Sequence, residues 1–401
     1  MTNVPKIRFK GFTNAWEQRK LGEIADIFDG THQTPKYTDS GVKFVSVENI
    51  KNLTGTNKFI SAEDYNSQFK NKADVGDIFM TRITAGVIGE TAIVENNESL
   101  AYYVSLALIK LKDGMNSEFV NYCIDTDTFK HELNKRIIHT AFPKKINLSE
   151  VGKCEINYSN PDEQQKVGSF FHTLNSLIAA NQQKVDGLKQ VKSAYLQQMF
   201  PQTEERVPRV RFAGFNGDWE ESRLGELLIK NSEKNTGQLI SNVESVSNKF
   251  GFVKQAEYFE DRQIASKDTS NYYVIRKGAF AYNPSRINVG SIAVKKSDDT
   301  SIVSPLYVSF YTGDKLAETF LWNWFKTSAF EQERQFSTVG GVRDTLSYEA
   351  LQDISILLPS SVEQVIIGNF FLALEEQIFA QSKLVNNLKA LKTSYLQKMF
   401  I

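Results

Sequence analysis

The chain has 401 residues, 41% of them hydrophobic, and its 47 Lys and Arg residues balance its 47 Asp and Glu residues. This composition excludes a largely disordered protein, and the charge balance excludes a uniformly basic surface for nucleic acid. We find neither a signal-peptide core nor an apolar run long enough to span a bilayer, and therefore expect a cytoplasmic protein without membrane contact.

The opening of the chain recurs near its midpoint. PKIRFKGFTNAWEQRKLGEI, at 5–24, matches PRVRFAGFNGDWEESRLGEL, at 208–227, in its Pro, Arg, Phe, Gly, Trp and Glu positions. The two halves of the chain therefore begin alike.

The segments that follow differ between the halves. Residues 30–50 form a turn-rich polar loop that leads into a strand, whereas residues 230–253 are unrelated in sequence. Farther on, VGDIFMTRITAGVIGETAIV from Val75 and KGAFAYNPSRINVGSIAVKK from Lys277 both place Gly before short apolar strands and an Arg in the turn. The pattern indicates a shared scaffold with altered loops.

A short helix is expected in each half, around Ser117–Arg136 and Lys315–Gln335, from the spacing of aromatic and apolar residues. A polar loop and a last strand should follow before the long helix. Each half is thus predicted to be a mixed α/β (α+β) globular domain followed by a long helix. The predicted boundaries are 1–159 for the first domain, 160–200 for the first helix, 201–207 for a polar linker, 208–359 for the second domain and 360–401 for the second helix.

The strongest pattern is a stretch that occurs twice, at 160–200 and 360–400, and aligns without a gap. Its apolar residues alternate in spacings of three and four, which places them on one face of a helix. A helix of about 40 residues, roughly 60 Å long, would leave this stripe in water, so the natural partner of each helix is the other. The stripe residues expected to pair the helices or dock partners are Phe171, Leu174, Ile178, Val185, Leu188, Tyr195, Phe371, Leu374, Ile378, Val385, Leu388 and Tyr395.

Capping boxes are predicted at both helix starts. Asn160 should accept a hydrogen bond from the backbone of Glu163 while the Glu163 side chain reaches back, and Ser360 with Glu363 repeats the pattern. Polar residues also interrupt the stripe at matching places, where they would fix helix register, unless they are simply polar positions at a solvated end. These matched positions are Asn181 with Gln381 and Lys192 with Lys392.

Motifs for catalysis are absent from the sequence. It contains neither a GxxxxGK[ST] loop nor a GxGxxG turn between a strand and a helix, and its two cysteines and four histidines lack zinc-site spacings, so we expect reduced thiols and no metal. Residues 283–286, Asn-Pro-Ser-Arg, are similar to the Asn-Pro-Pro-aromatic motif of amino-methyltransferases but lack the second proline and the aromatic. We interpret them as a turn.

Basic and hydrogen-bonding loops give the better functional signal. Arg and Lys bind phosphates or guanine edges and Asn and Gln pair with adenine, so divergent polar loops on a fixed scaffold could read a sequence. For any single residue, a solvated or fold-stabilising role is the alternative. The candidate DNA-binding residues are Thr31, Gln33, Thr34, Lys36, Tyr37, Arg82, Arg136, Lys144, Lys145, Asn283, Ser285, Arg286, Asn288 and Arg343.

Taken together, these repeats resemble the DNA-specificity (S) subunit of type I restriction-modification systems. The resemblance covers essentially the whole chain and rests on the RFxGFxxxWE openings, the GTHQTPKY loop, the GDIFMTR and YNPSRINVG turns, and the EQ-initiated helices that end in YLQQMF and YLQKMF. Any one of these motifs alone would be weak.

The resemblance implies two target-recognition domains that each read half of a split site in double-stranded DNA. It also implies an antiparallel coiled coil of the two long helices that docks two modification subunits, with restriction subunits completing the complex. S-adenosylmethionine, ATP and Mg²⁺ would then be bound by partner subunits, and this chain would be non-catalytic and bind no cofactor.

Two other functions stay open at the level of sequence. A pure coiled-coil scaffold for protein assembly would bind no DNA selectively. A self-contained methyltransferase that used Asn283 and Pro284 would bind S-adenosylmethionine by itself, but the missing cofactor loop argues against it.

Overall fold

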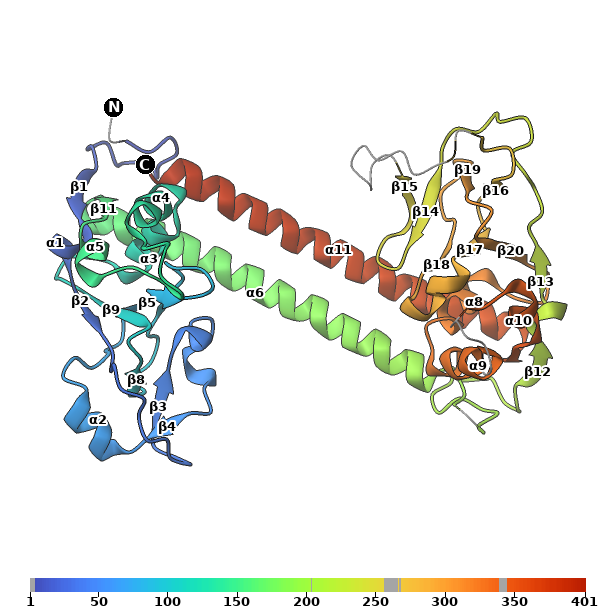
Figure 1. Cartoon of the computed structure of the whole chain (residues 1–401), viewed down its shortest axis with the longest axis horizontal. Coiled ribbons are helices and arrows are strands. Elements are labelled where there is room, and N and C mark those ends of the chain that lie inside the picture. Colours follow the sequence, from blue (N-terminus) through green and yellow to red (C-terminus); the bar gives the residue numbers. More distant parts are fainter. Residues whose placement is uncertain (1–3, 203, 256–265, 267, 339–344) are drawn as a thin grey trace. The chain divides into compact units, whose positions relative to one another are not determined.

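The computed structural model describes residues 4–202, 204–255, 266, 268–338 and 345–401. The chain forms two compact units, unit 1 from Met1–Gln182 with Lys383–Ile401 and unit 2 from Gln183–Ser382. Both predicted long helices are present, as α6 (Pro161–Gln198) and α11 (Ser361–Met399). Each unit holds one globular domain, the start of one long helix and the end of the other (Figure 1).

Unit 1 is built on a four-stranded antiparallel sheet in the order β2-β9-β5-β7. A second sheet has the order β4-β3-β8, with β3 and β8 parallel, and two further pairs are β1 with β11 and β6 with β10. The strands are β1 (Glu17–Lys20), β2 (Ala25–Asp29), β3 (Val42–Val45), β4 (Phe59–Ile60), β5 (Ile78–Thr81), β6 (Ile83–Thr84), β7 (Thr91–Ile93), β8 (Leu100–Tyr102), β9 (Leu106–Leu111), β10 (Lys144–Lys145) and β11 (Glu155–Tyr158). The shorter helices are α1 (Leu21–Ile24), η1 (Val47–Asn49), η2 (Leu53–Gly55), α2 (Ala62–Gln68), α3 (Ser117–Asp125), α4 (Asp127–Arg136) and α5 (Leu148–Gly152).

The central sheet of unit 1 is covered on both faces. Successive side chains of a strand point to opposite faces, and in β5 Ile78 and Met80 join one apolar cluster while Phe79 joins another. Strand β9 divides in the same way, with Ile109 in the first cluster and Leu108 in the second. Continuous apolar runs rather than alternating ones are therefore found in these strands.

Unit 2 repeats this scaffold. Its four-stranded antiparallel sheet has the order β13-β20-β17-β18, equivalent to β2-β9-β5-β7, and β12 pairs with β21 as β1 pairs with β11. Two further antiparallel pairs are β14 with β15 and β16 with β19. The strands are β12 (Glu220–Arg223), β13 (Leu228–Lys230), β14 (Glu244–Ser247), β15 (Gly251–Lys254), β16 (Tyr273–Ile275), β17 (Phe280–Tyr282), β18 (Ile292–Val294), β19 (Ser301–Val303), β20 (Val308–Thr312) and β21 (Ser355–Leu358). The shorter helices are η3 (Leu224–Glu226), η4 (Pro284–Val289), α8 (Glu318–Trp324), α9 (Ser328–Thr338) and α10 (Tyr348–Asp353).

The single short helix predicted in each half is instead a pair of helices. In unit 1 the break falls at Thr126, whose Oγ1 donates to the carbonyl of Cys123 and accepts from the amide of Phe129. In unit 2 Thr327 makes the same two bonds, between α8 and α9. A threonine side chain that caps the second helix ends the first, and the apolar periodicity of the sequence does not report this.

The first turn of each long helix is anchored by a buried carboxylate. The amide of Glu163 donates to the Asn160 side chain as predicted. However, the Glu163 carboxylate does not reach back, because Arg8 binds both of its oxygens, at 2.6 and 2.8 Å, and the Trp16 indole donates to it at 3.2 Å. The capping box is therefore only half formed, and the carboxylate joins the opening motif of the domain to the helix.

Unit 2 contains the same pairing of arginine and carboxylate, but without a hydrogen bond from its tryptophan, Trp219, to the carboxylate. The Arg211 guanidinium binds both oxygens of Glu363 at 2.7 and 2.8 Å, and the amide of Glu363 donates to Ser360 Oγ. The next residue of each helix, Gln164 or Gln364, is also buried. Its side chain accepts from the amide of the residue before α3 or α8. It also donates to the carbonyl of the residue that follows β11 or β21.

The last residues of each helix complete the core of the opposite domain. In unit 1 the ring of Phe400 lies 6.0 Å from Trp16, 5.4 Å from Phe119 and 5.6 Å from Phe171. In unit 2 the ring of Phe200 has the matching neighbours Trp219, Phe320 and Phe371. Within each unit the start of one helix packs beside the end of the other, which is the antiparallel arrangement.

The matched lysines of the two helices find different acidic partners. In unit 2 Lys192 lies 2.7 Å from the carboxylate of Glu375, which also binds Lys326 at 2.6 Å and Lys296 at 3.5 Å. In unit 1 Lys392 lies 3.5 Å from Asp125 of α3. Neither lysine is merely a polar position at a solvated end.

We predict that Phe400→Ala destabilises unit 1 specifically. Truncating a buried Phe costs about 3–5 kcal/mol, and the lost contacts lie with Trp16, Phe119 and Phe171. Hydrogen exchange of the full chain should show faster exchange in β5 and β9 than in β17 and β20. Leu391→Ala, an exposed residue of the same helix, is the control. Equal loss of protection in both units would contradict the assignment.

Acid titration provides a second prediction. Although burial opposes ionisation, Lys326 and Lys192 lower the pKa of Glu375 to about 2. A carboxylate whose folded-state pKa is depressed contributes stability above its unfolded-state pKa, about 4.5, and loses it as the pH falls toward 2. The melting temperature of Glu375→Gln should therefore decrease less steeply below pH 4.5 than that of the unmodified protein. Glu376→Gln, which changes an exposed neighbour, should show the same decrease as the unmodified protein.

Candidate nucleic-acid interface

The polar loop at 30–38 leaves the end of β2 in unit 1. Its start is fixed, because a Cβ on Gly30 would collide with the carbonyl oxygen of Tyr102, and the amide of Thr31 donates to that same oxygen at 3.1 Å. Beyond this anchor the predicted site residues turn outward. Those that are exposed are Gln33, Thr34, Lys36 and Tyr37, while Thr31 is half-buried.

The structure corrects the prediction that Arg82 contacts DNA. Arg82 is buried, and its guanidinium donates to the carbonyls of Ile146 and Val104 at 3.2 and 3.1 Å. It also lies 3.4 Å from the carboxylate of Asp29, at the end of β2, and burial lowers the pKa of Arg82. All of its contacts are internal, so Arg82 holds the end of β2 and the residue after β10 together and is not available to a base edge.

A second exposed loop adjoins this arginine. Strand β6 follows Arg82 directly and pairs with β10, which consists of Lys144 and Lys145. The backbone of Lys145 pairs in turn with Ile138, and residues 139–143 form the turn between them. Both lysines are exposed. Arg82 thus supports the bases of two surface loops, at 31–37 and at 138–145.

The basic residues of unit 1 differ in how their charge is compensated. Arg136 is half-buried and lies 2.7 Å from the carboxylate of Glu132, so its predicted role in DNA binding is weakened by an internal ion pair. Of the predicted DNA-binding cations in the described part of unit 1, Lys36, Lys144 and Lys145 are exposed and form no ion pair. Their positive charges are available to an approaching phosphate.

In unit 2 the predicted residues lie on η4, between β17 and β18. Asn283 is the helix N-cap, with its side chain accepting from the amide of Ser285, which confirms the interpretation of 283–286 as a turn. Gly290 ends the helix with φ of +79°. Ser285, Arg286 and Asn288 are exposed along this short helix.

Arg286 is not the equivalent of Arg82. Gly76 and Gly278 occupy the same turn before β5 and β17, with φ of +93° and +84°, and this alignment puts Pro284 opposite Arg82. The Arg in each turn therefore has a different role, structural in unit 1 and exposed in unit 2. The candidate Arg343 lies outside the described residues.

The predicted helix stripe is largely internal. Phe171, Leu174, Val185, Phe371 and Val385 are buried within the chain, and the other stripe residues are half-buried. Tyr395 packs on Phe170 in unit 1 and Tyr195 on Phe370 in unit 2, with ring centroids 5.1 Å apart in both. These side chains pair the helices, so docking of partners must use other residues.

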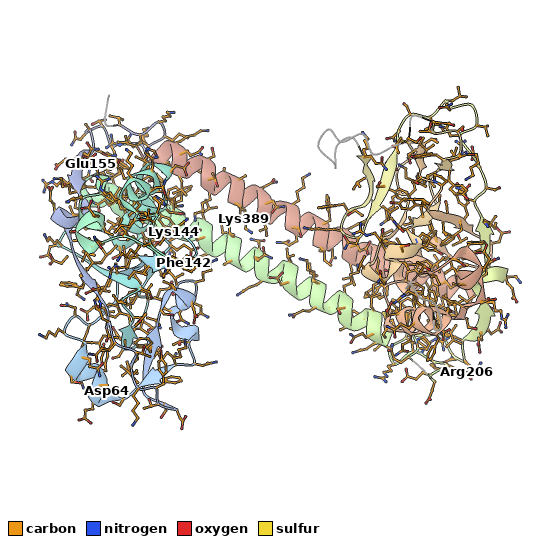
Figure 2. All side chains as sticks on the ribbon, viewed as in Figure 1. Asp64, Phe142, Lys144, Glu155, Arg206 and Lys389 are labelled. Atoms are coloured by element: carbon orange, nitrogen blue, oxygen red, sulfur yellow. The ribbon has the colours of Figure 1, made fainter. Side chains whose placement is uncertain are left out.

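Sequence analysis did not identify the apolar side chains that are exposed on the two long helices and in several loops. The residues of the long helices are Leu177, Leu384 and Leu391 in unit 1, and Val191, Val362, Val365, Ile366 and Phe379 in unit 2. Of the loop residues that the structure describes, the most exposed is Phe142, at 95%; it is labelled in Figure 2. Its sequence signal was an aromatic inside the basic loop HTAFPKK.

In the described residues, none of the helices has the length and hydrophobicity of a transmembrane span. Among these residues there is also no group of three or more His, Cys, Asp or Glu side chains arranged to hold a metal ion. Cys123 and Cys154 are free and buried in the core of unit 1.

Sequence comparisons point to one protein family. Residues 14–190, which include the first domain and most of α6, match the model of the type I restriction modification DNA specificity domain. The type I restriction enzyme MjaIX specificity subunit of Methanocaldococcus jannaschii is 22% identical over 309 residues, covering 71% of this chain and 67% of that protein.

Solved structures with the same fold cover nearly the whole chain. The S subunit of a type I restriction-modification system from M. genitalium superposes with a TM-score of 0.64 at 14% identity, over 99% of both chains. A chain from a structure concerned with complex assembly and conformational transition of a type I restriction-modification system has a TM-score of 0.50 at 16% identity, over 96% of this chain and 97% of that one. At these identities the likeness shows the fold alone.

We predict that Arg82→Ala lowers the free energy of unfolding by about 2 kcal/mol or more, because each buried carbonyl that loses its donor costs about 1–3 kcal/mol. Arg286→Ala, on the surface of unit 2, should change it by no more than about 0.5 kcal/mol. Thermal unfolding of the two variants provides the measurement. An Arg82→Ala variant that melted like the unmodified protein yet lost DNA selectivity would restore the readout role.

Proposed function

We propose that this chain, which belongs to the type I restriction-modification DNA-specificity family, selects the DNA site for its complex by reading a bipartite sequence, one half with each unit. The observation that carries the proposal is the repeated sheet order, β2-β9-β5-β7 and β13-β20-β17-β18, bearing different exposed loops. A shared scaffold would present each loop set to DNA in a similar way. Different side chains on the loops would then read different bases.

The long helices would dock two modification subunits. Their sequences match and each unit pairs one helix start with one helix end, so similar surfaces occur twice in one chain and could receive two identical subunits. Exposed apolar residues such as Leu177 and Leu391 in unit 1 and Val191 and Phe379 in unit 2 are suited to such contacts. Restriction subunits would complete the complex.

The members of this family are specificity subunits, which are non-catalytic. In the proposed complex, partner subunits in the cytoplasm would bind S-adenosylmethionine, ATP and Mg²⁺ and methylate an adenine that is rotated out of the duplex. This chain would contribute the choice of sequence and the spacing between half-sites, which depends on the length of the helices.

Mapping of N6-methyladenine tests the proposal. A genome that expresses the cognate modification subunit should acquire a new split motif with an unread spacer when this chain is also expressed. Replacing residues 25–153 by the corresponding segment of another specificity subunit should change one half of the motif only, since the exchange leaves the β1–β11 pair and the Glu163 anchor in place. An assembled complex that methylates no motif would support a protein scaffold instead.

We further predict that Lys144→Ala combined with Lys145→Ala weakens DNA binding by the complex without preventing its assembly. Each lost phosphate contact reduces the slope of log K against log salt concentration by about 0.9, so the double variant should be less steep by about 2. Lys135→Ala with Lys153→Ala removes the same charge from lysines that are paired with Glu132 and Glu150, and is the control. An unchanged salt slope would exclude phosphate contacts at β10.

A further inference from the structure

The turn between Ile138 and β10 presents a phenylalanine to solvent. Phe142 is 95% exposed, more than any other large apolar residue that the structure describes. Removing a Phe side chain from water is worth about 1.5–3 kcal/mol, and this residue gains none of it within the chain. Single exposed apolar residues are common on proteins, so the surroundings of Phe142 decide whether it has a role.

The base of this turn is firmly held. The amide of Ile138 donates to the carbonyl of Lys145 at 2.8 Å, and the amide of Ile146 donates to the carbonyl of Arg82 at 3.0 Å. Ile146 is buried, and the ring of His139 is bound to the carbonyl of Asn134. The ring of Phe142 is thus carried at the tip of a projection whose two sides are fixed, and little ordering would be needed when it binds.

The charge around the tip is positive. The segment HTAFPKK, at 139–145, contains no acidic residue. Lys144 and Lys145 follow the turn directly as β10 and form no ion pair in the described part of the chain. A protein partner would have to be acidic to match this surface, whereas DNA offers both phosphates for the lysines and flat apolar base faces for the ring.

We infer, on the basis of the proposed function, that Phe142 inserts its ring between two adjacent base pairs at or beside the first half-site, while Lys144 and Lys145 bind the neighbouring phosphates. Apolar wedges of this kind partly unstack a base step and bend the duplex. The opening would contribute to recognition through the deformability of the step and not through base edges.

The inference is specific to unit 1. At the matching place of the second half, the sequence from Thr338 to Thr345 contains no aromatic residue. Only one half-site of the bipartite sequence should therefore show a step opened in this way.

Permanganate footprinting of the complete complex tests the inference, because permanganate oxidises thymines that have lost stacking. The probes are duplexes that carry the mapped motif, with thymines at the unread positions beside each half-site. The thymine opposite a methylated adenine is an internal control, since the partner exposes it by base flipping whether or not Phe142 is present.

The expected result is one additional reactive thymine, near the first half-site only, that persists in Phe142→Trp and disappears in Phe142→Ala. Loss of the stacked ring should weaken DNA binding by Phe142→Ala on the order of tenfold, in line with the usual effect of removing one aromatic–base stack, with the methylated motif unchanged. Val75→Ala, an exposed apolar residue before β5, should behave like the unmodified chain.

Two results would overturn the inference. The first is an identical thymine pattern and affinity in Phe142→Ala and the unmodified chain. The second is release of a modification subunit from the Phe142→Ala complex, which would make Phe142 a protein contact. In both cases the motif would still be methylated by the unmodified complex, whereas failure of the proposed function would leave no motif at all.

Discussion

The first turn of each long helix contains a carboxylate that is almost completely removed from water, and the arrangement of both units depends on how it is held. A buried charge is tolerated only when it is paired and hydrogen-bonded. Arg8 forms a bidentate salt bridge with Glu163, and Arg211 forms one with Glu363. Each pair fastens the opening segment of a domain to the helix that closes it, about 150 residues later. The domain ends are thus fixed, and the loops between them are left to vary.

A second constraint comes from the helix ends. The core of each unit is completed by a phenylalanine of the other half's helix, Phe400 in unit 1 and Phe200 in unit 2. Neither half of the sequence contains all the side chains of one core. The duplicated sequence therefore does not behave as two independent domains, and the antiparallel helix arrangement follows from the same packing that stabilises the domains.

The surface that we assign to DNA is supported from inside. Arg82 binds backbone carbonyls near both the loop at 31–37 and the turn at 138–145, so a buried arginine determines where exposed lysines and Phe142 lie. The residue that supports the loops is therefore different from the residues that would contact DNA. Loop residues could change to read other bases, provided that the scaffold beneath is kept. Unit 2 illustrates this, because it has η4 between β17 and β18 where unit 1 has Arg82 and β6 between β5 and β7.

The sequence by itself determined the repeat, the two long helices with nearly correct ends, the mixed α/β domains and the turn at Asn283, because these features arise from local periodicity, capping residues and proline. Tertiary structure alone decided which polar residues are internal. Arg82 and Arg286 stand in similar sequence surroundings, yet one is buried and the other exposed, since burial depends on strands that are distant in the chain. The same holds for Glu163, whose carboxylate binds Arg8 instead of its own helix end, and for Thr126, which divides a predicted helix. The basic segment around Phe142 did not by itself show whether this ring is buried or exposed, and the pairing of Ile138 with Lys145 places it on an exposed turn.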